Sequence, residues 1–458
     1  MFNRPLSGEG QGRMAQNPAR TICLSFLLII GVGTVLLILP FASRDGTFTP
    51  PLDALFTATS ATCVTGLVVY DTWGHWSAAG QGVILALIQV GGLGLVTMGA
   101  FFQVLAGRRM GLRAADLAKE SVNSESFAGV RHLVRTVILG TLLVELLGTL
   151  ALAVTFVPRM GLREGLAVSA FTSVSAFCNA GFDLMGREGT PYASLTAFAG
   201  NWLVTLPAMA LVVLGGLGFV VWDDLLKWRR TRTVTLHTKI VLTLTALLLG
   251  AGFVGFLALE WKNPGTLGPL TLPGKLNAAL FHSVSCRTAG FNTVDMAALT
   301  DQSKVLSVLL MFVGAAPAGT GGGIKVTTVA VMVMTIVSVL RGEEETTIGH
   351  RRVEARTVYR ALTLITMGVL IVAVSTVVIW LSLGGGFTLT DVLFEETSAF
   401  ATVGLSVGVS GSAGVLGKLV LICNMFLGRV GLLSLALAMA IKSGGNKKVL
   451  PSARVIIG

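Results

Sequence analysis

A short glycine-ended segment occurs four times in this chain of 458 residues, at nearly equal intervals. Each copy follows a short stretch rich in apolar residues with Ser, Thr and Phe, and the four glycines lie 115, 109 and 114 residues apart. The copies are Thr62–Gly66, Phe177–Gly181, Cys286–Gly290 and Phe400–Gly404. Self-similarity at a fixed interval marks a repeated structural unit, so the sequence predicts a fold built from four copies of one unit.

Composition decides whether this repeat lies in water or in lipid. Hydrophobic residues make up 53% of the chain, charged residues only 12%, and the mean hydropathy is +0.79. A soluble fold would lack the polar residues needed to cover its surface, so we expect membrane lipid as the surroundings. The net charge of +11 comes from short basic runs between apolar segments. No single basic arm or domain exists, which argues against a nucleic-acid partner.

Eight apolar segments are long enough to cross a hydrocarbon core of about 30 Å as helices. Between the members of each successive pair lies a segment of 11 to 15 residues, which is too short to span and is predicted to be a re-entrant helix. The predicted fold is an all-α membrane protein of eight transmembrane helices with four re-entrant pore loops in a pseudo-fourfold arrangement. The long segments are 21–43, 78–106, 133–158, 192–226, 236–260, 304–340, 356–385 and 414–441, and the short ones are 51–61, 162–176, 273–285 and 388–400.

This pattern divides the chain into four pore repeats between two terminal segments. Of the 34 Lys and Arg residues, 23 lie in the terminal segments and the loops between repeats, and eight lie on the opposite side. The positive-inside rule therefore predicts a multi-pass protein of the inner (cytoplasmic) membrane, with both termini in the cytoplasm and the pore loops entering from outside. The predicted boundaries are 1–20 for the N-terminal segment, 21–108, 127–230, 234–341 and 354–441 for the repeats, and 442–458 for the C-terminal tail.

The segment 304–340 is too long for one straight crossing and holds five glycines and a proline within 314–325. Glycine costs about 1 kcal/mol and proline about 3 kcal/mol in a helix interior, so the helix is predicted to break. A kink without ion contact and a gate beneath the filter both fit, and membership of a pore repeat favours the gate. Lys325 either holds this loop closed through an acidic or carbonyl partner or snorkels to the cytoplasmic surface. The candidate gate residues are Gly314, Pro317, Gly319, Thr320, Gly321, Gly322, Gly323 and Lys325.

The repeated loops have the chemistry that a dehydrated cation needs. Backbone carbonyls can replace its water shell without fixed charge, and a glycine permits the turn or positive φ with which an extended loop ends. The side chains before the glycines differ among the copies, which fits ligation by backbone atoms. The short helices would also point their negative C-terminal ends at one axis. We therefore expect an ion filter formed by Cys63, Val64, Thr65, Gly66, Cys178, Asn179, Ala180, Gly181, Arg287, Thr288, Ala289, Gly290, Ala401, Thr402, Val403 and Gly404.

These segments resemble the Trk/Ktr/HKT potassium transporter superfamily over almost the entire chain. The resemblance is carried by VTGL, CNAGFD, SCRTAGFN and ATVGLS at the four loops, GAAPAGTGGGIK in the broken segment and FLGRVG in the last span. Because only one span precedes the first loop, the chain most resembles the Ktr-type membrane subunits (KtrB). The resemblance implies that Gly66, Gly181, Gly290 and Gly404 are filter glycines, that 314–325 is a gating loop, and that Arg429 lies near the permeation path.

The resemblance also implies a substrate and partners. The substrate is the potassium ion, with coupling to sodium ion (symport) left open and no organic cofactor in the chain. Gly66 stands where sodium-selective plant-type relatives carry serine, which implies a preference for potassium. The family pattern is a homodimer with one pore per protomer on a cytoplasmic ring of nucleotide-binding regulatory subunits (KtrA-like). This chain has no G-x-G-x-x-G after a predicted strand, so a separate chain must form the ring.

Two further basic residues fall at membrane depth, where a charge costs about 2.5 to 3.5 kcal/mol. Arg429 either projects into the pore as a barrier to cations or pairs with a carboxylate such as Glu145. Arg287 lies within the third filter segment, where a cation that faced the ions would repel them. We expect it to point behind the filter, toward Glu395 or Glu396.

Acidic residues follow three of the filter glycines, and Asp71, Asp183 and Asp295 are predicted to lie near the outer mouth. They either concentrate cations there or are ordinary solvated loop residues.

Two other classes of protein fit the sequence less well. A secondary transporter of an organic solute, the alternative function, would show inverted repeats, whereas the four copies here have the same order of elements. A membrane-embedded enzyme would need a nucleophile and base, or metal ligands, at membrane depth. The chain has no HExxH or paired intramembrane Asp, and its five cysteines show no CxxC spacing.

Overall fold

The computed structural model describes residues 18–94, 130–188, 190–349, 351–432 and 434. Most of the predicted N-terminal segment 1–20 and the whole of the tail 442–458 lie outside the described residues. The same is true of the later parts of the predicted segments 78–106 and 414–441.

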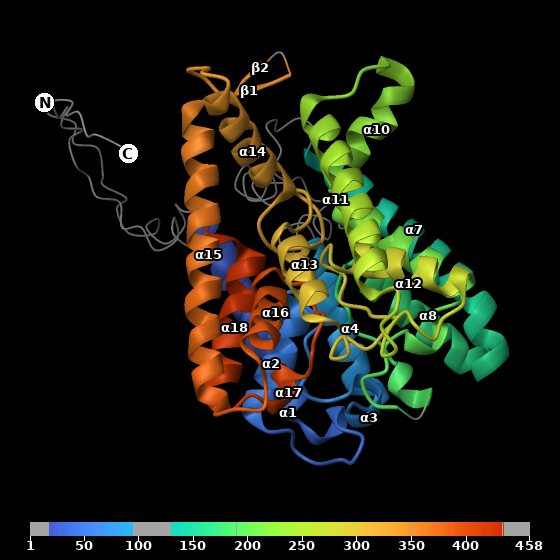
Figure 1. Ribbon diagram of the computed structural model, residues 1–458. Coiled ribbons are helices and arrows are strands. Elements are labelled where there is room, and N and C mark those ends of the chain that lie inside the picture. Colours follow the sequence, from blue (N-terminus) through green and yellow to red (C-terminus); the bar gives the residue numbers. More distant parts are fainter. Residues whose placement is uncertain (1–17, 95–129, 189, 350, 433, 435–458) are drawn as a thin grey trace, which may run out of the picture.

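Helices dominate the described chain and form four successive groups (Figure 1). The first group holds α1 (Pro18–Ile38), α2 (Pro51–Thr62) and α4 (Ala78–Leu93), and the second holds α7 (Val130–Met160), α8 (Leu162–Phe177), α9 (Trp202–Gly216) and α10 (Phe219–Thr231). The third holds α11 (Leu236–Glu260), α12 (Leu272–Ser285), α13 (Asp301–Phe312) and α14 (Val326–Leu340). The fourth holds α15 (Ala355–Leu383), α16 (Leu389–Phe400) and α18 (Val415–Val430).

Small elements mark the two ends of the molecule in Figure 1. The short helices α3 (Thr72–His75) and α17 (Val409–Ser412) lie at the lower end, which we call the mouth end. The antiparallel strands β1 (Thr347–Ile348) and β2 (Arg351–Arg352) lie at the opposite end.

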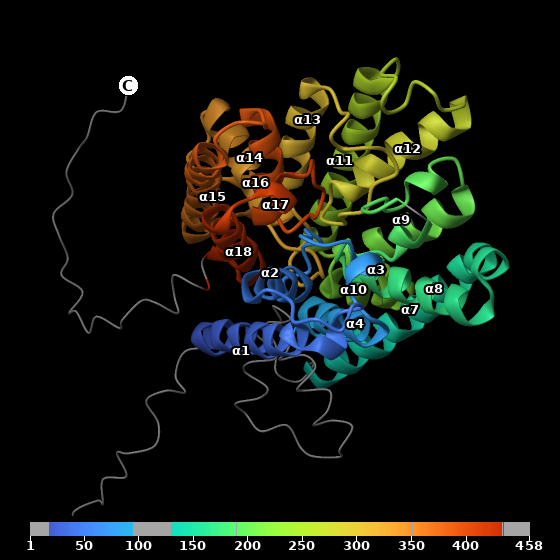
Figure 2. The same cartoon turned by 90° about the horizontal axis from the view of Figure 1, so that it is seen from below.

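The four groups surround a common centre, as Figure 2 shows from the mouth end. In each group the short helix, α2, α8, α12 or α16, packs on the long helix that precedes it. The later helix of each group packs on the short helix of the next group, through the pairs α4 with α8, α9 with α12, α13 with α16, and α18 with α2. The contacts are therefore cyclic and close from the fourth group to the first.

The short helices begin where local chemistry favours a helix start. Pro51 opens α2 and Pro273 lies in the first turn of α12, where the missing N–H costs nothing. Thr388 and Asp391 form a capping box at the start of α16. The four lengths predicted from the sequence agree with the structure within one residue at each end.

The predicted segment 192–226 is not one continuous helix. α9 begins only at Trp202, and α10 continues from it at an angle of 95°. Gly218 between them has a φ of +87°, a left-handed conformation that glycine adopts without steric cost. Gly215 packs so closely on the carbonyl oxygen of Phe177 that an added Cβ would overlap it. The glycines of this segment therefore allow close packing at Gly215 and the bend at Gly218.

Among the described residues, four helices are long and apolar enough to cross a membrane, namely α1, α7, α11 and α15, or five if α9 and α10 count as one span. α4 and α14 are apolar but shorter. The segment 304–340 is interrupted, because α13 ends at Phe312 and α14 begins at Val326. The chain is a multi-pass helical membrane protein, and the complete set of eight crossings stays a prediction.

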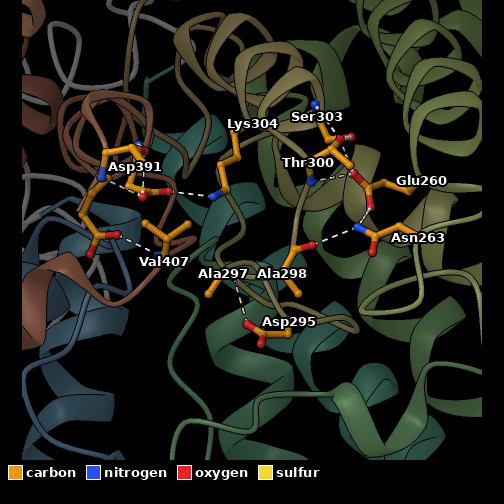
Figure 3. A network of polar contacts seen from close by, with 12 residues as sticks. Glu260, Asn263, Asp295, Ala297, Ala298, Thr300, Ser303, Lys304, Asp391 and Val407 are labelled. Atoms are coloured by element: carbon orange, nitrogen blue, oxygen red, sulfur yellow. Dashed lines mark hydrogen bonds and ion pairs between the residues drawn. The ribbon is translucent and has the colours of Figure 1, made fainter. Parts of the chain in front are cut away.

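Two ion pairs join neighbouring groups at equivalent places. Lys304 in α13 donates to Asp391 in α16 at 2.6 Å (Figure 3), and Lys418 in α18 donates to Asp53 in α2 at 2.6 Å. Each lysine is the fourth residue of its helix. Burial disfavours the charged form of Asp391, but hydrogen bonds from Lys304 and Thr388 outweigh it and hold the pKa of Asp391 below its ordinary value. Asp391 is therefore ionised at neutral pH, and the contribution of the pair to stability is lost as pH falls through that lowered pKa.

Replacing Lys304 by methionine is expected to destabilise the protein by about 3 to 5 kcal/mol, because it leaves the Asp391 carboxylate buried without its partner. Thermal unfolding of the detergent-solubilised protein measures the effect as a lower midpoint. Lys227→Met is the matched control, since Lys227 pairs with Asp223 on the surface with 60% of its side chain exposed, where a pair is worth about 0 to 1 kcal/mol. Equal shifts for the two variants would contradict a special role for the buried pair.

Candidate ion filter

The four filter glycines, Gly66, Gly181, Gly290 and Gly404, meet in a closed ring. A Cβ added to Gly66 would lie 2.5 Å from the carbonyl oxygen of Ala180 in the second group. A Cβ on Gly181 would lie 3.0 Å from Ala289 O, and one on Gly290 would lie 2.6 Å from Val403 O. Gly404 faces the carbonyl oxygen of Thr65 even more closely. Each filter glycine therefore lies against the carbonyl group of the residue just before the filter glycine of the next group. The glycine of the fourth group lies against the carbonyl group of the first, which closes the ring.

The backbone before each glycine is left-handed rather than extended as expected from the sequence. The residues two places before the glycines have φ values of 58° at Val64, 60° at Asn179, 67° at Thr288 and 52° at Thr402. Such values are uncommon outside glycine and are strained for β-branched side chains. In three copies the residue just before the left-handed one has a right-handed backbone, namely Cys63, Cys178 and Ala401. Alternating right- and left-handed residues turn successive N–H groups to one side of the chain, which leaves the carbonyls for the other side.

Serines of the short helices bind the N–H groups of the filter. Ser60 accepts a hydrogen bond from Thr65 N through its carbonyl (2.8 Å) and from Gly66 N through Oγ (3.1 Å). Ser398 does the same for Val403 N (2.8 Å) and Gly404 N (3.0 Å). The N–H groups are thus satisfied within their own group. The carbonyl oxygens of Thr65 and Val403 accept no hydrogen bond from the described residues.

The second and third groups repeat half of this arrangement. Ala180 N donates to Ser175 O at 2.7 Å, and Ala289 N donates to Ser285 O at 3.0 Å. The sequence reasoning missed these serines. A serine five or six residues before every filter glycine was the signal that could have identified them.

The carboxylate partner expected for Arg287 is wrong. Its Nη1 donates to the carbonyl oxygen of Val313 at 2.5 Å. Glu395 instead accepts from Val407 N, Ser406 and Ser410, and so holds the chain that follows the fourth filter loop. Arg287 therefore joins the third filter loop to the end of α13, where the interrupted segment begins.

Glu396 is also engaged elsewhere, since it accepts a hydrogen bond from Asn424 of α18. Its carboxylate therefore holds α16 to α18 within the fourth group.

Arg429 reaches the interrupted segment and not Glu145. Its guanidinium donates to the carbonyl oxygens of Thr320, Gly91 and Gly92, the last at 2.9 Å. Glu145 accepts from Gln89, so the alternative of an Arg429 pair with that carboxylate is wrong.

Lys325 donates to the carbonyl oxygen of Gly321 at 2.7 Å, which matches the carbonyl partner considered for it. Arg429 and Lys325 thus bind the same short stretch of backbone.

The interrupted segment, 313–325, forms a compact loop between α13 and α14. Its ends meet, because Val313 and Ile324 form a β-bridge and Gly314 N donates to Ile324 O at 2.8 Å. Thr320 N donates to Gly215 O at 3.1 Å, and Gly323 N donates to Gly428 O at 3.2 Å. A Cβ on Gly218 would meet Pro317 O at 2.5 Å, and one on Gly319 would meet Gly215 O at 3.1 Å. The loop is therefore fixed to the second and fourth groups.

A cavity of about 540 Å³ opens at the mouth end of the ring. It is lined by all four filter glycines and by Asp71, Asp183 and Asp295, so the structure brings the three predicted acids together. Each also accepts a backbone hydrogen bond, as Asp295 does from Ala297 N at 2.9 Å (Figure 3). Three carboxylates in one cavity create a negative potential that attracts cations.

Within the described ranges, no group of three or more His, Cys, Asp and Glu side chains is arranged to hold a metal ion. The candidate ligands of this site are the backbone carbonyl oxygens of the ring.

Known proteins resemble the chain along nearly its whole length. The family model TrkH, described as a cation transport protein, matches residues 9–449. The chain is 40% identical over 425 residues to the Ktr system potassium uptake protein B of Vibrio alginolyticus, covering 92% of this chain and 91% of that protein. It is 37% identical over 444 residues to the protein of the same name from Bacillus subtilis, covering 96% and 97%. It is 36% identical over 433 residues to the potassium/sodium uptake protein NtpJ of Enterococcus hirae, covering 94% of each.

Solved structures add a likeness of fold. The potassium transporter TrkH from Vibrio parahaemolyticus superposes with a TM-score of 0.69, covering 95% of this chain and 87% of that one. The sequence identity is 18%, so this comparison bears on the fold alone.

Proposed function

The chain belongs to the TrkH family of cation transport proteins, and we propose that it mediates potassium uptake across the cytoplasmic membrane through the ring of its filter glycines. It is a transporter and not an enzyme. Relatives at 36 to 40% identity are named for the uptake of potassium, or of potassium and sodium. Their names support the ion, while the path that the ion takes must be argued from this chain.

The closed ring of carbonyls is the observation that carries the proposal. The carbonyl oxygens of Thr65, Ala180, Ala289 and Val403 each lie at the glycine of a neighbouring group. The backbone N–H groups of these same four residues donate hydrogen bonds to the carbonyl oxygens of Ser60, Ser175, Ser285 and Ser398. Carbonyl oxygens held in a ring can replace the hydration shell of a potassium ion.

We further propose that 313–325 is the gate and that the mouth end faces outward. Arg429 and Lys325 hold the backbone of this loop. The cavity with Asp71, Asp183 and Asp295 lies on the other side of the filter ring. The negative mouth would then collect cations from outside, and the loop would control their entry to the cytoplasm.

The proposed assembly has more than one component. Two relatives are named as protein B of a Ktr system, which supports a system of more than one component. We propose a homodimer of this chain with a separate ring of nucleotide-binding (KtrA-like) subunits. We also propose sodium dependence, which the name of the Enterococcus hirae relative supports.

Reconstitution of the full chain into proteoliposomes tests the function. We expect potassium uptake well above that of protein-free vesicles, with sodium a poorer substrate and choline none. Repeating the assay with and without external sodium tests the sodium dependence. Potassium uptake no faster than in protein-free vesicles would refute the proposal.

A further inference from the structure

Four residues occupy equivalent places just before the filter ring and differ in polarity. Val64, Asn179, Thr288 and Thr402 stand two places before their glycines, share a left-handed backbone and are completely buried. Three of these side chains are polar and one is apolar. Each of the three polar side chains, Asn179, Thr288 and Thr402, contacts the loop 313–325.

Thr320 makes the polar contact from the loop. Its Oγ1 lies 3.1 Å from Phe177 O and 3.3 Å from Asn179 Oδ1 and donates its hydrogen there. The nitrogen of the same Asn179 amide, Nδ2, donates to Thr288 Oγ1 at 3.0 Å and to Arg287 O at 3.3 Å. One buried amide thus links the second filter loop, the third filter loop and the interrupted segment.

The next two residues of the loop press against the other polar side chains. A Cβ on Gly321 would overlap Thr288 Oγ1, and a Cβ on Gly322 would overlap Thr402 Oγ1. Thr402 Oγ1 is buried and has no hydrogen-bond partner among the described residues. Glycine is therefore required at both places for the loop to approach this closely.

We propose that Asn179, Thr288 and Thr402 form a polar collar that docks Thr320, Gly321 and Gly322 and so positions the gate directly beneath the filter. The contact of Asn179 with Thr320 is the main latch. When the loop withdraws, the side-chain oxygens of Asn179, Thr288 and Thr402 can bind the water shell of a passing cation. These new contacts compensate for the contacts that the oxygens lose with the loop. This inference rests on the proposed function and assigns the gate its docking site.

Flux measurements on paired variants test the latch. Thr320→Val removes the donor at nearly constant shape and is expected to raise basal potassium flux into proteoliposomes roughly two- to tenfold, as the loss of one hydrogen bond would. Asn179→Gly removes the acceptor and accepts the left-handed backbone, and it is expected to raise flux by a similar factor. Because both changes break the contact between Asn179 and Thr320, which can be lost only once, the double variant is expected to gain less than the product of the two single effects.

Two further variants separate the latch from general damage. Thr320→Ser keeps the hydroxyl group and is expected to keep the flux of the unaltered chain. Thr172→Val is the matched control, since Thr172 lies in α8 with a buried hydroxyl that has no partner among the described residues. Gel filtration in detergent checks folding, and Thr320→Ala replaces Thr320→Val if the valine variant does not fold.

The ion preference, measured in the same vesicles, distinguishes the possible failures. A positioning role predicts higher flux in Thr320→Val with an unchanged preference for potassium over sodium. Unchanged flux in that variant, or additive effects in the double variant, would overturn the latch while leaving potassium transport intact. Absence of flux in the unaltered chain would instead refute the proposed function.

Discussion

Replacing Gly66 by serine is expected to lower the preference for potassium over sodium about tenfold or more, which corresponds to about 1.4 kcal/mol. Gly66 has a φ of +95°, and an added Cβ would lie 2.5 Å from Ala180 O and 3.0 Å from the Cα of Gly181. A side chain here must displace the carbonyl of the neighbouring group. One of the four ring oxygens then moves, and the fit to a dehydrated potassium ion is lost.

The measurement is the ratio of potassium to sodium uptake in proteoliposomes, with Gly66→Ala beside Gly66→Ser. Steric displacement of Ala180 O predicts a loss of preference in both variants. Gly46→Ser is the control for backbone strain, because Gly46 has a φ of +67° with nothing within 4 Å of an added Cβ. An unchanged ratio in Gly66→Ser would remove Gly66 from the filter.

The sequence predicts the short helices better than the ring that they support. Pro51, Pro273 and the capping box of Thr388 with Asp391 are local signals, and the helix ends follow from them. The left-handed residues before the glycines have no common side chain, since they are Val, Asn, Thr and Thr. Tertiary contacts around the ring impose that conformation, so it leaves no signature in composition or periodicity.

Partners of the buried basic residues were the least predictable feature. Sequence reasoning named carboxylates as partners of Arg287 and Arg429, and a carbonyl only as one option for Lys325. All three residues donate to backbone carbonyls. Any residue supplies a carbonyl, so only the fold reveals which one is unpaired and near. These carbonyls are exposed to side chains because the chain is not helical at Val313, Thr320 and Gly321.

Deleting residues 318–323 is expected to raise potassium flux about tenfold or more, since it removes several hydrogen bonds of about 0.5 to 1.5 kcal/mol each that hold the loop in the path. The deleted stretch contains Thr320, whose carbonyl binds Arg429 and whose hydroxyl binds Asn179, and Gly321, whose carbonyl binds Lys325. The expected increase exceeds that of any single latch variant because all of these contacts are lost together.

The geometry of the loop allows this deletion without separating α13 from α14. Val313 and Ile324 are paired across the base of the loop, and Gly314 N bonds Ile324 O. The two residues therefore already lie side by side, and residues 314–317 remain to connect them after the deletion. Flux in proteoliposomes is the measurement, with the ratio of potassium to sodium recorded alongside it. Higher flux with an unchanged ratio is the expected result, because the filter carbonyls belong to other segments. Unchanged flux would show that 313–325 does not obstruct the path, and a lost preference for potassium would show that the loop is needed to hold the filter in shape.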